Sequence, residues 1–86
     1  MPKSLYRPEY DTFLRLLRET RIAAGLTQRQ VAERLGRPQS FVSKVESGER
    51  RCDVVELWDM CSAVGVDPLE FAREFEHALH SARQID

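Results

Sequence analysis

Four polar side chains gather on one face of a short segment near the middle of the chain. Residues three or four positions apart are neighbours on the surface of an α-helix, and in the segment 39–47 this spacing groups Gln39, Ser40, Ser43 and Lys44. Glutamine pairs with adenine through two hydrogen bonds, lysine donates to the acceptors of guanine, and serine bonds to several groups. The face is therefore a candidate for reading base edges in the major groove of DNA.

The elements that must hold this face are two short helices joined by a tight turn. Residues 27–46 read TQRQVAERLGRPQSFVSKVE, which is the sequence form of a helix-turn-helix. Gly36 permits the turn, and the small Ala32 permits a close crossing of the two helices. The apolar residues fall on one face of each helix, with Val31, Ala32 and Leu35 on the first and Phe41, Val42 and Val45 on the second.

Helix starts and stops can be read along the rest of the chain. Capping residues precede three apolar-periodic segments, at Thr27, Asp53 and Asp67. A glycine follows four such segments, at Gly25, Gly36, Gly48 and Gly65. These signals predict helices over 9–24, 28–35, 39–47, 54–64 and 68–81, and no segment alternates like a strand. We therefore predict an all-α fold of one domain over 9–81, with a mobile arm at 1–8 and a short tail at 82–86.

The charge of the chain is unevenly divided along its length. A net charge of −1 conceals 11 basic and six acidic residues in 1–51, against two basic and eight acidic residues in 52–86. The basic part suits contact with phosphates, and the acidic part suits a surface turned away from them. No apolar run is long enough to span a bilayer, and the start lacks the apolar middle of a signal peptide. We therefore expect a cytoplasmic protein with no membrane partner.

Apolar residues at helical spacing identify the expected core. Trp58 is assigned to the core of the monomer, and the alternative is a contact between subunits. Cys52 and Cys61 lack the spacing of a metal or redox motif, so both are expected as reduced thiols. The first helix offers Phe13, Leu16, Leu17 and Ala24 to the core, and the helix 54–64 offers Val54, Leu57, Trp58 and Cys61.

The last predicted helix carries an apolar stripe wide enough for the core and a partner. One recognition helix reads only a few base pairs, so a binder of this type needs two copies about 34–36 Å apart on an inverted repeat. We therefore predict a homodimer, although the helix could instead only complete the core of the monomer. His77 and His80 are spaced for a metal, but a solvated helix end is preferred and no cofactor is predicted. The candidate interface residues are Phe71, Phe75, Ala78 and Leu79.

Residues from about 17 to 67 resemble the phage-repressor and Cro group of helix-turn-helix regulators, the Xre type. The runs that carry the resemblance are RIAAGLTQ at 21–28, VAERLG at 31–36, QSFVSKVESGER at 39–50 and VVELWDMCSAVGVDP at 54–68. The resemblance implies a five-helix lambda-repressor-like DNA-binding domain, with the helix-turn-helix at its second and third helices. It further implies that Gln39, Ser40, Ser43 and Lys44 face base edges.

The same resemblance assigns roles to residues that flank the recognition helix. It implies that Gln28 touches phosphate and that Arg21 and Glu46 form a structural ion pair between the first and third helices. Pro38 departs from the family pattern, because many relatives have a capping hydroxyl residue there. Because proline is preorganised for a helix start, we expect Pro38 to move the start of the third helix by one residue, with Gln39 or Ser40 satisfying its first free amides.

Phosphate contacts are predicted on both sides of the recognition helix. The amino end of the helix 28–35 carries positive partial charge, with Gln28 and Arg29 beside it. On the other side, Arg50 and Arg51 follow Gly48 and could clamp the backbone, or they could be ordinary exposed arginines. Arg37 in the turn has the same two interpretations, and Lys3 and Arg7 on the arm are not assigned to DNA.

These features favour a homodimer that binds an inverted repeat in double-stranded DNA and regulates transcription, as a repressor. Alternatives with the same domain are an antitoxin and a restriction-modification controller. An adapter that keeps the fold without binding DNA is disfavoured by the basic half of the chain. No catalytic set or phosphate loop appears in the sequence, so an enzyme is not predicted, and neither is a small-molecule effector.

Overall fold

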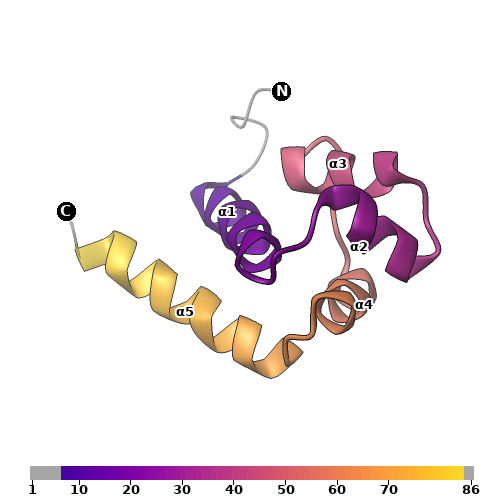
Figure 1. Cartoon of the computed structure of the whole chain (residues 1–86). Helices are drawn as coiled ribbons and strands as arrows, with labels where there is room; N and C mark the ends of the chain where they lie inside the picture. The colour runs from indigo at the N-terminus through magenta and orange to yellow at the C-terminus, as the bar shows by residue number, and fades with distance from the viewer. Residues whose placement is uncertain (1–6, 85–86) are drawn as a thin grey trace.

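Five α-helices make up the structure, a computed structural model that describes residues 7–84 and the side chains of 7–81 (Figure 1). They are α1 (Pro8–Ala23), α2 (Gln28–Leu35), α3 (Gln39–Ser47), α4 (Val54–Val64) and α5 (Pro68–Gln84). No strand occurs within the described range, and the all-α prediction is confirmed. Most of the predicted arm, residues 1–6, and residues 85–86 of the predicted tail lie outside the described residues.

Reciprocal capping pairs mark the starts of α2 and α4, whereas α5 runs to Gln84, beyond its predicted end at 81. At the start of α2, the Gln30 amide donates to the Thr27 hydroxyl at 3.1 Å, and the Thr27 amide donates to the Gln30 side chain at 2.9 Å. Asp53 and Glu56 form the same reciprocal cap at the start of α4, with distances of 2.8 and 3.1 Å. Each cap satisfies amide groups that a helix start leaves without a partner.

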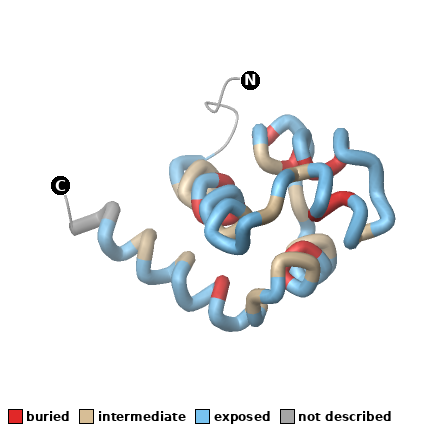
Figure 2. The backbone as a smooth tube through the Cα atoms, in the orientation of Figure 1, coloured by how far each residue is buried: buried red, intermediate tan, exposed pale blue. Residues whose placement is uncertain are grey.

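The core forms where the first four helices meet and α5 closes one side. α1 and α4 lie between α5 and the α2–α3 pair (Figure 1). The buried stretches of the helices face this interior (Figure 2). Val31 of α2 and Val42 and Val45 of α3 are almost fully enclosed, and Cys61 of α4 lies in the same cluster. The small Ala32 is also buried, which allows α2 and α3 to pack closely.

Three expected core residues are instead on the surface. Trp58 is 53% exposed and Val54 is 71% exposed, because α4 packs inward through Met60 and Cys61 and no described element covers the neighbouring stripe. The prediction of Trp58 as a core residue is therefore wrong. Ala24 is also exposed, since α1 ends at Ala23 and Ala24 is its C-cap.

The stripe on α5 is divided between the core and a half-buried edge. Phe71 is only 2% exposed, so it belongs to the core and offers no surface to a partner, which corrects its assignment as an interface residue. Phe75 packs against the same core, and its ring meets that of Phe13 edge-on with centroids 6.2 Å apart. Ala78 and Leu79 are half-buried.

The turn of the helix-turn-helix depends on Gly36. Its backbone has φ of 69° and ψ of 32°, in the left-handed region, and the next amide, that of Arg37, donates to the Ala32 carbonyl at 3.0 Å. A Cβ atom at Gly36 would meet no neighbouring atom within 4 Å, so the constraint on this position is its backbone conformation and not steric crowding. The turn therefore sets the angle at which α3 leaves α2.

We expect Gly36→Ala to lower the free energy of unfolding by about 1–2 kcal/mol, the cost of a left-handed conformation for a residue with a Cβ. Urea denaturation of both proteins measures this loss. Gly36→Asn is the matched control and should lose less, because asparagine adopts this conformation more readily. Equal stability of the alanine variant and the wild type would contradict the left-handed turn.

Candidate nucleic-acid interface

The four candidate base-reading residues all lie on the exposed side of α3. Gln39, Ser40, Ser43 and Lys44 are exposed, whereas Phe41, Val42 and Val45 of the same helix are buried. The helix therefore presents a continuous polar face to solvent and anchors itself through the opposite side. Such a face carries both donors and acceptors, which is what recognition of base edges requires.

The start of α3 lacks a side-chain cap. Pro38 is the N-cap, with ψ of 151°, and the Phe41 amide donates to the Pro38 carbonyl at 3.0 Å. The helix begins at Gln39, the start of the predicted range 39–47, but Pro38 occupies the N-cap without displacing the start, and neither Gln39 nor Ser40 forms a side-chain cap. The first turn of α3 is therefore left without a side-chain cap, and an amino end of a helix favours an anion.

A part-buried ion pair joins α1 to α3 below this face. Nε of Arg21 donates to Oε2 of Glu46 at 2.7 Å, and Nη2 donates to Oε1 at 3.1 Å. Nη1 of Arg21 also donates to the Leu26 carbonyl at 2.8 Å, in the loop between α1 and α2. The Glu46 side chain is only 4% exposed, so the pair is held away from water. Two parallel bonds of this kind fix orientation as well as distance.

Gln28 joins the same cluster. Its Nε2 donates to Oε1 of Glu46 at 3.0 Å, and the residue is half-buried. The side-chain amide therefore links the start of α2 to α3, whereas the family resemblance implies a phosphate contact. Arg29, the next residue, is exposed, with its Nε 3.9 Å from a carboxylate oxygen of Glu33, and its charge reaches solvent at the start of α2.

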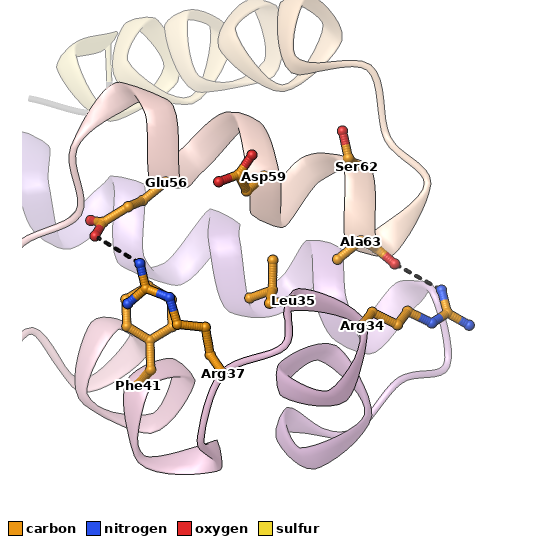
Figure 3. Close-up of a pocket in the computed structure, with 8 residues that line it drawn as sticks. All are labelled: Arg34, Leu35, Arg37, Phe41, Glu56, Asp59, Ser62 and Ala63. Carbon is orange, nitrogen blue, oxygen red and sulfur yellow. Dashed lines mark hydrogen bonds and ion pairs between the residues drawn. The ribbon is translucent and has the colours of Figure 1, made fainter.

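On the other side of α3, two arginines stack on one aromatic ring. The guanidinium carbon of Arg37 lies 4.1 Å from the centroid of Phe41, and that of Arg50 lies 4.8 Å from it. Both guanidinium groups face Glu56 of α4. The two carboxylate oxygens of Glu56 accept hydrogen bonds from Arg50 at 2.9 and 2.8 Å, and Nη2 of Arg37 lies 3.8 Å from Oε2. In Figure 3 the Arg37 guanidinium overlies the Phe41 ring, and a dashed line joins it to the Glu56 carboxylate. The sequence predicted Arg50 as a clamp on the DNA backbone but did not predict that it binds a carboxylate of the protein itself.

The electrostatics of this cluster follow from the contact between Arg50 and Glu56. Hydrogen bonds from Arg50, then the capping bond from Asp53 and the charge of Arg37, hold the pKa of Glu56 below its ordinary value despite partial desolvation. The reciprocal bond raises the pKa of Arg50. The carboxylate is therefore ionised throughout the neutral range.

Arg51 is fixed in a different way. Its guanidinium lies over the ring of Tyr10 of α1, with 4.7 Å between the guanidinium carbon and the ring centroid. The hydroxyl of Tyr10 accepts a hydrogen bond from the Cys52 amide at 3.1 Å. Tyr10 thus ties the loop between α3 and α4 to α1, and Arg51 remains exposed on the surface.

The two cysteines are free thiols, and neither is activated. Burial, followed by the charges of Glu56 and Asp53, raises the pKa of Cys52 to about 12. Burial also raises the pKa of Cys61, with Asp67 adding to the effect. A thiol that stays protonated is a weak nucleophile and a weak metal ligand. Among the described residues, no three histidine, cysteine or acidic side chains gather where a metal could bind.

Glu56 is the residue whose role beside α3 was not predicted from the sequence. The pattern Asp53–Glu56 identified it as a capping residue only. Its second role arises because the loop after Gly48 returns Arg50 to the start of α4, six positions before Glu56 in sequence. A basic residue shortly before an acidic capping box is the only sequence signal of this contact.

The sequence matches a family described as "Helix-turn-helix domain" over residues 12–73. An uncharacterised HTH-type transcriptional regulator, y4dJ of Sinorhizobium fredii, is 40% identical over 60 residues, covering 70% of this chain and 73% of the relative. With this family match the chain belongs to the helix-turn-helix transcriptional regulators of the Xre type.

Two solved structures support the same assignment. An XRE-family like protein from Pseudomonas syringae pv. tomato is 49% identical with a TM-score of 0.80, covering 87% of this chain and 92% of that one. The restriction-modification controller protein C.AhdI from Aeromonas hydrophila is 32% identical with a TM-score of 0.68, covering 76% and 98%. None of the helices formed by the described residues combines the length and the apolar character needed to traverse a bilayer.

We expect Glu46→Gln to lower the free energy of unfolding by about 3 kcal/mol, because the Arg21 charge then lacks its counter-ion in a part-buried site. Urea denaturation measures the change. Glu19→Gln is the matched control. Both side chains of the Arg15–Glu19 pair are exposed, so its loss should lower the free energy of unfolding by only about 0.3 kcal/mol. Similar losses in the two variants would show that enclosure does not strengthen the Arg21–Glu46 pair.

Proposed function

We propose that this protein binds double-stranded DNA sequence-specifically and represses transcription in the cytoplasm, with α3 in the major groove. The observation that supports this most directly is the exposed polar face of α3 on a helix fixed from the inside by Val42 and Val45. A helix whose position is fixed by the core can present side chains to bases with a defined register. Gln39, Ser40, Ser43 and Lys44 are the proposed base-reading residues.

Phosphate contacts on both flanks of α3 complete the proposed interface. Arg29 is exposed beside the amino end of α2, and Arg51 is exposed in the loop before α4. Backbone amides at the start of α2 provide further donors, so Gln28 acts there through its position and not through its side chain. Phosphate contacts of this kind fix the register of the protein on the duplex without reading sequence.

We further propose that two copies bind an inverted repeat as a homodimer. An exposed apolar stripe on α4 supports this, formed by Val54, Val55 and Trp58 at helical spacing. Large apolar side chains that gather on a surface are typical of contacts between proteins, and tryptophan contributes more than most. The proposed interface is therefore centred on α4, with Phe75, Ala78 and Leu79 of α5 at its edge.

A restriction-modification controller is the second candidate function. Its support is the likeness to C.AhdI, whose description names that role and whose chain is covered over 98% of its length at 32% identity. Both functions use the same DNA-binding surface, so the genes beside this one, and not its fold, would separate them. The antitoxin hypothesis has no comparable support.

We expect Lys44→Ala to change the sequence preference of the protein, with a loss of about 1–3 kcal/mol at a site where Lys44 contacts a base. Selection of bound sequences from random duplex DNA, with the wild type and the variant side by side, tests this. Arg73→Ala, on α5, removes the same charge away from α3 and should leave the selected sequence unchanged. Selection of one motif by all three proteins would contradict base reading by Lys44, and no selected motif for the wild type would contradict the proposed function.

We expect Trp58→Ser to weaken self-association by on the order of 30-fold, since a central tryptophan typically contributes about 2 kcal/mol or more to an interface. Sedimentation equilibrium of the free proteins measures the effect. Leu69→Ser is the matched control, because Leu69 is 63% exposed but lies on α5 outside the stripe. An undiminished dimer in Trp58→Ser would exclude α4 as the interface, and a wild type that stays monomeric on DNA would exclude the homodimer.

A further inference from the structure

Glu56 is held from both sides, by the start of its own helix and by two arginines beside α3. Its Oε1 accepts the Asp53 amide at 3.1 Å and Nη1 of Arg50 at 2.9 Å, and its Oε2 accepts Nη2 of Arg50 at 2.8 Å. Nη2 of Arg37 lies 3.8 Å from the same Oε2. The Glu56 carboxylate therefore faces Arg37 and Arg50, the two cations that rest on the Phe41 ring of α3.

The members of this cluster differ in their freedom to move. The Glu56 side chain is 13% exposed, whereas those of Arg37 and Arg50 are 46% and 42% exposed. The capping bond from Asp53 fixes the carboxylate, whereas the arginines rest on Phe41 and keep a large part of each side chain exposed. An incoming anion could therefore draw the arginines away, but the carboxylate could not follow them.

We propose that Glu56 competes with DNA phosphates for Arg37 and Arg50, and so lowers binding to DNA of random sequence. This inference rests on the proposed DNA-binding function. A phosphate offers the two guanidinium groups the same chemistry as a carboxylate, namely paired oxygens that accept two parallel bonds. Transfer of either arginine to DNA leaves the Glu56 carboxylate with fewer donors in a poorly hydrated place, which opposes the transfer.

The competition affects random DNA more than an operator. Binding to random sequence is almost entirely electrostatic, and the protein can turn on the duplex until its cations meet phosphates. Binding to an operator gains additional free energy from base contacts made by α3, so its affinity depends less on these two arginines. Glu56 is therefore a specificity-determining residue that makes no contact with DNA itself.

The test compares the wild type with Glu56→Gln, each as the whole chain of residues 1–86. The affinity of each protein for a random duplex and for the operator selected by the wild type is measured across a series of salt concentrations. Glutamine keeps an oxygen that accepts the Asp53 amide, so the cap and the fold are retained. We expect Glu56→Gln to bind random duplex about five- to tenfold more tightly at low salt, with the slope of log K against log salt steeper by about 0.9, the value for one added phosphate contact. The gain on the operator should be smaller.

Glu19→Gln is the matched control, because it removes one negative charge from an exposed pair on α1, and it should change neither affinity by more than about twofold. In an Arg37→Gln, Arg50→Gln background, Glu56→Gln should have no further effect, since Glu56 then has no arginine to withhold. Equal or weaker binding of random duplex by Glu56→Gln would overturn the inference, as would an equal gain on the operator. A wild type that binds no duplex would overturn the proposed function, and the inference with it.

Discussion

An almost fully enclosed carboxylate, that of Glu46, receives hydrogen bonds from two helices that precede its own. Arg21 reaches it from α1 with two bonds, and Gln28 reaches it from the start of α2. Because Arg21 also binds the Leu26 carbonyl, the loop between α1 and α2 is fixed by the same group. These bonds act together with the enclosed Val42 and Val45, which hold α3 against the core, and so help to give its exposed face a defined direction.

Helix α4 connects two surfaces that would otherwise be independent. Its first turn carries Glu56 against the arginines beside α3, and its outer stripe carries Val55 and Trp58 into solvent. A helix of 11 residues is a rigid rod about 16 Å long, so neither surface can shift without the other. Two copies joined through this stripe would hold their recognition helices at one separation, which a DNA site with two half-sites requires.

The sequence predicted the elements well, because the signals that define them are local. Capping pairs such as Thr27 with Gln30, and turn residues such as Gly36, act within a few positions. Trp58 was misplaced because helical spacing identifies a stripe but not the element that covers it. The contact of Arg50 with Glu56 was missed because it depends on the path of a loop. The contact of Gln28 with Glu46 was missed for a similar reason, since the two residues are 18 positions apart.

The reliance on local caps and turns also bears on how fast the chain folds. Helical domains, in which contacting residues are mostly near in sequence, fold in roughly microseconds to milliseconds, far faster than sheets assembled from distant segments. Here α2, its turn and α3 occupy only 20 consecutive residues, 28–47, with their own start and stop signals. Synthesis of a chain takes seconds, so folding adds no delay between translation and availability of the finished protein.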